Sequence, residues 1–117
     1  MNINVRQRGP ATILDVDGQI TFESTPSLRE KILGALKAKD RSAVLLVNLS
    51  AVAYMDSSGI ATLVEGLKAA QAQKANFGLF GLTKNTRNVL ELVRLDKVFK
   101  IFDTEDDAVR QLAEPAS

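Results

Sequence analysis

The spacing of hydrophobic residues along the chain predicts alternating strands and helices. Apolar and polar residues alternate in segments 2–7 and 11–18, and the turn signal Arg-Gly-Pro lies between them, so these segments are predicted to form a hairpin. Apolar residues recur at helical spacing in segment 24–39, with Thr25 as the expected helix cap. The continuous apolar run at 43–49 is typical of a strand that is buried on both faces.

The rest of the chain continues this alternation of helices and strands. Ile60, Leu63, Val64 and Leu67 share one face of a helix that is expected to end near Gln73. The pattern then predicts a strand at 76–82, a helix at 83–95, a strand at 98–103 and a helix at 104–113. The order ββαβαβαβα predicts an α/β fold, with a mixed central sheet of about five strands and about four helices.

The composition fits one compact domain. Apolar residues make up 45% and charged residues 25% of the 117 residues, so we expect a single domain at 1–113 and a flexible tail at 114–117. The net charge of +1 provides no basic footprint for nucleic acid. No segment approaches the roughly 18 apolar residues of a membrane span, so no membrane insertion is expected. A cytoplasmic location and a monomer in the free state are the default expectations.

The residue types that are missing limit the chemistry of the chain. Histidine is absent, which removes the commonest general base and metal ligand. Cysteine is also absent, so a thiol nucleophile and a cysteine-bound zinc ion are excluded. We therefore expect a binding protein rather than an enzyme, without a cofactor or a metal of its own.

The stretch Asp56, Ser57, Ser58, Gly59 stands between the predicted central strand and the next helix, and two interpretations apply. Asp or Ser before an apolar repeat is the usual N-cap, which contributes about 1 kcal/mol to helix stability. Open α/β sheets also place their sites at such connections, where exposed hydroxyls are accessible to kinases. A phosphoryl group on Ser57 would lie against the free N–H groups of the helix start, and together with Asp56 would reverse the local potential.

The segment Tyr-Met-Asp-Ser-Ser-Gly-Ile-Ala-Thr-Leu-Val at 54–64 carries a family resemblance. With the apolar strand before it and the segment 92–109 after it, it resembles the bacterial anti-sigma factor antagonists, which are single STAS domains. The resemblance covers nearly the whole chain. In that family, the serine that directly follows the aspartate of the motif is phosphorylated by an anti-sigma factor that is also a kinase, and this position is Ser57.

This resemblance implies a binding module that is controlled by phosphorylation. The unphosphorylated form would bind the anti-sigma factor serine kinase and release the sigma factor, and a serine phosphatase would restore this form after phosphorylation. Apart from the phosphoacceptor, the residues expected to contact the partner are Tyr54, Met55, Asp56, Ser58, Gly59, Ile60 and Leu63. Gln19 and Thr21 stand where family members often carry acids, so recognition of the kinase at that loop is predicted to differ.

A second role within the same fold stays open. STAS domains also serve as partners of membrane transporters, including ABC-type lipid transporters, and need not be phosphorylated there. Gln19 and Thr21 are compatible with such an accessory subunit.

An enzymatic alternative rests on the sequence Asp-Val-Asp-Gly, which resembles the first motif of haloacid-dehalogenase-type phosphatases. Asp15 would then be the nucleophile, Asp17 the acid/base, and the acidic run at 105–107 would supply magnesium ligands. Simple strand alternation explains the same pattern, with Leu14 and Val16 directed inward and the two aspartates outward.

Overall fold

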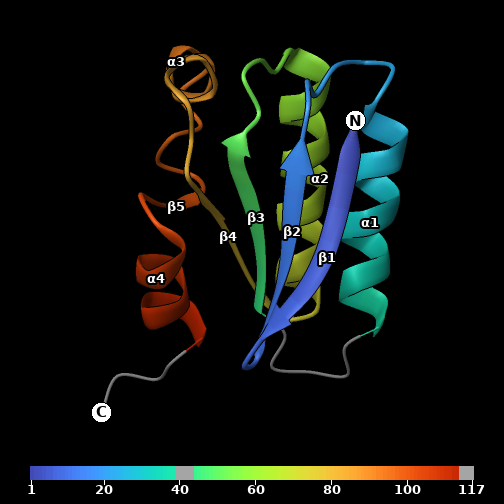
Figure 1. Ribbon diagram of the computed structural model, residues 1–117, viewed down its shortest axis with the longest axis vertical. Coiled ribbons are helices and arrows are strands. Elements are labelled where there is room, and N and C mark those ends of the chain that lie inside the picture. Colours follow the sequence, from blue (N-terminus) through green and yellow to red (C-terminus); the bar gives the residue numbers. More distant parts are fainter. Residues whose placement is uncertain (39–43, 114–117) are drawn as a thin grey trace.

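A five-stranded mixed sheet forms the centre of the molecule (Figure 1). The computed structural model describes residues 1–38 and 44–113, so the predicted tail at 114–117 lies outside the described residues. The strands follow one another across the sheet in chain order, namely β1 (Asn2–Arg8), β2 (Ala11–Asp17), β3 (Val44–Ala51), β4 (Asn76–Phe80) and β5 (Lys100–Phe102). β1 and β2 are antiparallel and form the predicted hairpin, whereas each later strand pairs parallel to the one before it.

Helices cover both faces of this sheet. They are α1 (Thr25–Ala38), α2 (Ser57–Ala72), α3 (Lys84–Leu92) and α4 (Glu105–Ala108), which continues into a π-helical turn at Val109–Ala113. In Figure 1, α1 and α2 run side by side, α4 lies beside β5, and α3 lies at the end of the sheet where α2 begins. The predicted single α/β domain with a mixed sheet is confirmed.

The alternating side chains of the sheet supply two hydrophobic cores. In β3, Leu45, Val47 and Leu49 pack into the larger core, together with α1 and α2. Val44 and Leu46 point to the opposite face and pack with α4. The continuous apolar run of β3 is therefore needed because both of its faces are buried.

Two local predictions differ from the structure. Thr25 does not cap α1, since its hydroxyl donates to the carbonyl of Phe22 at 3.0 Å and the residue already belongs to the helix. The last strand contains only Lys100–Phe102 and not the whole predicted segment 98–103, although the preceding Phe99 is buried.

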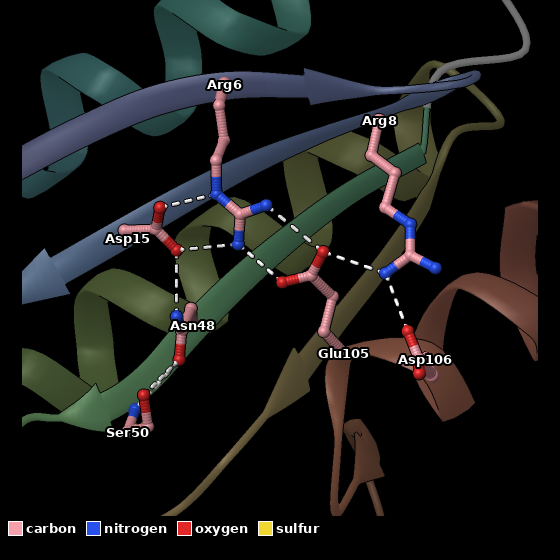
Figure 2. A network of polar contacts seen from close by, with 7 residues as sticks. All are labelled: Arg6, Arg8, Asp15, Asn48, Ser50, Glu105 and Asp106. Atoms are coloured by element: carbon pink, nitrogen blue, oxygen red, sulfur yellow. Dashed lines mark hydrogen bonds and ion pairs between the residues drawn. The ribbon is translucent and has the colours of Figure 1, made fainter.

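A network of ion pairs connects α4 to the hairpin of β1 and β2. Figure 2 shows the Arg6 guanidinium between the carboxylates of Asp15 and Glu105, with 2.6 Å from Arg6 Nε to Asp15 Oδ2 and 3.1 Å from Arg6 Nη1 to Glu105 Oε2. Arg8 Nη1 lies 2.9 Å from both Glu105 Oε2 and Asp106 Oδ1. Arg6 is the main cause that lowers the pKa of Asp15 and of Glu105 below the ordinary range.

Replacing Arg6 should destabilise the fold in a pH-dependent way. We expect Arg6→Met to lower the free energy of unfolding by about 1–2 kcal/mol at pH 7, since the removed bonds are charged but partly exposed. Carboxylates with lowered pKa values stabilise the folded state above their unfolded pKa of about 4, and this stabilisation is lost as the pH falls through the folded values. The difference between wild type and variant should thus shrink below about pH 4, as measured by urea unfolding.

Arg29→Met is the matched control, because Arg29 pairs with Glu65 at an exposed position. It should change the free energy of unfolding by less than about 0.5 kcal/mol. Equal effects of the two substitutions would contradict a special role of the Arg6 network.

Candidate functional site

The candidate site is built where two loops extend the pairing of β2 and β3. Beyond the strands, Gly18 N donates to Ala51 O at 3.2 Å, Ile20 N donates to Tyr54 O at 3.0 Å, and Asp56 N donates to Ile20 O at 3.1 Å. Ile20 and Met55 form a parallel bridge between the two segments. The loop after β2 and the entry to α2 are thus one rigid unit.

Asp56 is the residue that joins this unit to the start of α2. Its Oδ1 accepts hydrogen bonds from the N–H groups of Ser58 at 2.9 Å and Gly59 at 3.2 Å, so Asp56 is the N-cap. Its Oδ2 accepts from the N–H group of Phe22 at 3.2 Å. Two of the helix N–H groups that were expected to be free for a phosphate on Ser57 are therefore already bound by Asp56.

Ser57 is the first residue of α2 and is exposed. Its neighbour Ser58 is half-buried, and the Ser58 carbonyl accepts a hydrogen bond from the Thr62 hydroxyl at 3.0 Å. Tyr54 is 44% exposed on the preceding loop. Ser57 and Tyr54 thus present side chains to solvent on the same connection.

Other residues that were expected to contact a partner lie in the core. Met55 is 1%, Ile60 6% and Leu63 0% exposed, and Gly59 is also buried. Their side chains pack under the loop because the apolar stripe of α2 must face the sheet. These four residues are therefore not surface residues as predicted, and they support the surface from the core. The predicted contact residues that reach the surface are Tyr54, Asp56 and Ser58, beside Ser57.

There is no room for a side chain at Gly59. A Cβ atom at this position would lie 2.6 Å from Met55 Cγ and 2.7 Å from Ile20 Cγ2. Only a residue without a side chain lets the first turn of α2 approach the loop after β2 so closely.

Sequence reasoning did not identify α3 as a support of the site. The Thr83 hydroxyl donates to the Val52 carbonyl at 2.8 Å, and Asn85 Oδ1 accepts from Met55 N at 3.3 Å. Thr83 is also the N-cap of α3. The start of α3 thus holds the β3–α2 connection from the side opposite the β2–α1 loop.

Phe22 is a surface residue that the sequence analysis missed. It follows Thr21 in the β2–α1 loop and is 75% exposed, although its backbone is bonded to Asp56. The available signal was an isolated aromatic residue between the polar residues Thr21 and Glu23.

The structure does not support the phosphatase alternative. Asp15 and Glu105 do approach one another, but the Arg6 guanidinium lies between them where a magnesium ion would be needed. Within residues 1–38 and 44–113, no group of three or more acidic side chains could hold a metal ion. Asp15 and Glu105 instead form ion pairs with Arg6.

Among the helices of the described ranges, none combines the length and the apolar character needed to cross a bilayer.

Comparisons with known proteins agree on the fold. Residues 2–108 match the family model of the STAS domain. An anti-sigma factor antagonist from Mycobacterium paratuberculosis superposes with a TM-score of 0.86 at 25% identity, covering 96% of this chain and 93% of that chain. The phosphorylated form of the Bacillus cell fate determinant SpoIIAA gives 0.72 at 18% identity, covering 94% and 98%. A sulfate transporter family protein from Wolinella succinogenes gives 0.74 at 18% identity, covering 91% and 89%.

Adding a methyl group at Gly59 should destabilise the protein. We expect Gly59→Ala to cost about 1–3 kcal/mol, because the new Cβ overlaps Met55 and Ile20. Gly34→Ala is the matched control, since Gly34 is an exposed position of α1 with no atom within 4 Å of an added Cβ. It should stabilise the protein by about 0.5–1 kcal/mol. Thermal and urea unfolding measure both effects, and a neutral Gly59→Ala would contradict the close packing.

Removing the Asp56 carboxylate should weaken the start of α2. Asp56→Ala is expected to cost about 1–2 kcal/mol, since it removes the cap and the bond to Phe22. Asp56→Asn should cost less, because its carbonyl oxygen still accepts from the first turn. Urea unfolding of both variants checks this order, and an unchanged Asp56→Ala protein would show that the cap contributes nothing.

Proposed function

Because the chain belongs to the STAS domain family, we propose that it is an anti-sigma factor antagonist that is switched by phosphorylation of Ser57. In its unphosphorylated form it binds an anti-sigma factor serine kinase in the cytoplasm, and the sigma factor is released. Phosphorylation by this kinase ends the binding, and a serine phosphatase restores it. The observation that carries the proposal is the exposed Ser57 in the first turn of α2, directly after a loop whose conformation is held by other residues.

Asp56 stabilises the start of α2 and Ser57 does not, and this difference supports a switch. The first turn of α2 is capped by the Asp56 carboxylate, so the fold does not depend on the Ser57 hydroxyl. Modification of Ser57 is therefore compatible with a folded domain. A residue that is exposed and dispensable for stability is a suitable phosphoacceptor.

The surroundings of Ser57 explain how a phosphate would end binding. A phosphoserine carries a charge of about −1.5 to −2, and it would lie next to the negative Asp56. Since Asp56 occupies the N–H groups of Ser58 and Gly59, the phosphate would project toward the partner. Burying such a charge in an interface with Tyr54 is costly, because its hydration is lost without a matching base.

The loop at Gln19 and Thr21 points to a kinase that does not depend on acids there. Gln19 is exposed, and its carbonyl accepts a hydrogen bond from the Ser24 hydroxyl at 3.0 Å. The Thr21 carbonyl accepts from the N–H groups of Ser24 and Thr25, which starts α1. Both residues therefore shape the loop through their backbones, and neither presents a charge to the partner.

A transporter accessory subunit is the second candidate. It is favoured by the match to the sulfate transporter family protein, which shares the fold over 91% of this chain. In that role the same end of the domain would dock onto a transporter subunit, with or without phosphate.

The proposal is tested with each anti-sigma factor kinase of the host, purified and incubated with this protein and ATP. Mass spectrometry should locate the phosphate on Ser57, and Ser57→Ala should abolish it. Ser57→Ala should bind that kinase at least about tenfold more tightly than Ser57→Asp, which corresponds to 1.4 kcal/mol or more. Both variants should unfold within about 0.5 kcal/mol of wild type.

Gln71→Glu is the control for added charge, because Gln71 is exposed in the last turn of α2, at the opposite end of the helix from Ser57. It should bind as the wild-type protein does. Phosphorylation by none of the kinases, or equal binding of Ser57→Ala and Ser57→Asp, would reject the switch and leave the transporter role.

A further inference from the structure

Phe22 is exposed to a degree that the fold itself does not require. Its side chain is 75% exposed in the β2–α1 loop, outside both hydrophobic cores. Phenylalanine is a large apolar side chain, and burying one fully is among the strongest single contributions that a residue makes to a contact. Binding of a partner over this loop would therefore gain from covering Phe22.

The backbone of Phe22 is fixed on both sides. Its N–H group donates to Asp56 Oδ2 at 3.2 Å, and its carbonyl accepts from the Thr25 hydroxyl at 3.0 Å. The segment before Phe22 is held as well, because the Ile20 N–H group donates to the Tyr54 carbonyl and the Ile20 carbonyl accepts from the Asp56 N–H group. The ring is thus presented on an ordered backbone, which reduces the entropy lost when a partner binds it.

Phe22 lies beside Ser57, close enough to be reached by an enzyme that acts on this serine. The Asp56 carboxylate that binds Phe22 N belongs to the residue directly before Ser57. A specific protein interface covers about 800 Å² on each partner, which extends well beyond one residue in every direction. The Phe22 loop therefore lies within the reach of an interface that is centred on Ser57.

We propose that Phe22 is the apolar anchor through which the anti-sigma factor kinase recognises this protein, and that the kinase carries an apolar pocket for its ring. This inference rests on the proposed function. It also accounts for the uncharged residues at positions 19 and 21, because Gln19 and Thr21 leave Phe22 as the large apolar side chain that the loop offers to a partner. The kinase would then recognise Phe22 by apolar contact and would not depend on acids at positions 19 and 21.

The test uses the host anti-sigma factor kinase that phosphorylates Ser57 in the assay above. Phe22→Ala should raise the KM for phosphorylation by about 10- to 100-fold with kcat unchanged, since burial of the ring contributes to binding and not to phosphoryl transfer. In the Ser57→Ala background, the same substitution should weaken binding of the kinase by a similar factor. Phe22→Leu should retain most of the affinity, because it keeps an apolar side chain.

Leu92→Ala is the matched control, because Leu92 is 82% exposed at the end of α3. It should leave KM, kcat and binding unchanged, and all variants should keep the melting temperature of the parent protein. The inference is overturned if Phe22→Ala stays within about twofold of the parent, or if Leu92→Ala loses as much affinity as Phe22→Ala. It is also overturned if sedimentation shows a dimer that Phe22→Ala dissociates, since Phe22 would then cover a second copy.

These outcomes separate the inference from the proposed function. Normal phosphorylation of Ser57 in the Phe22→Ala protein would reject the anchor and keep the switch. Failure of every host kinase to phosphorylate Ser57 would reject both.

Discussion

The structure of the candidate site depends on one carboxylate. Asp56 binds the N–H groups of Ser58 and Gly59 at the start of α2, and the N–H group of Phe22, which is 34 residues away in the chain. Buried or partly buried N–H groups at a helix start need such acceptors, and a single aspartate serves two segments at once. The position of the serine relative to the β2–α1 loop follows from this bond and from the ladder between Ile20 and Met55.

The sheet provides the rigid base for this arrangement. Because β3 is buried on both faces, by α1 and α2 on one side and by α4 on the other, its carboxyl end has little freedom to move. Arg6 and Arg8 hold the start of α4 to β1 through Glu105 and complete the cover of the second face (Figure 2). The loops that follow β2 and β3 thus begin from fixed positions.

On this base, buried and exposed residues of one short segment have separate tasks. Met55, Ile60 and Leu63 fill the core beneath the loop, whereas Ser57 and Tyr54 face solvent. This separation lets the surface change its charge while the core stays packed, which is what a phosphorylation switch needs. Phe22 is also exposed beside this segment, although it lies in a distant part of the chain. The candidate surface is therefore larger than the segment 54–59.

The order of the elements, the hairpin, the two-sided burial of β3 and the position of Ser57 at the start of a helix could all be predicted from the sequence. These features depend on local spacing of apolar residues and on local capping, which are legible in one segment at a time. Three features depend on the folded chain and could not be predicted. They are the hydrogen bond between Asp56 and Phe22, the close packing at Gly59, and the ion pairs that join Arg6 to Asp15 and Glu105. Each of these contacts joins segments that are distant in the chain, so their partners are set by how the strands align and not by any local pattern.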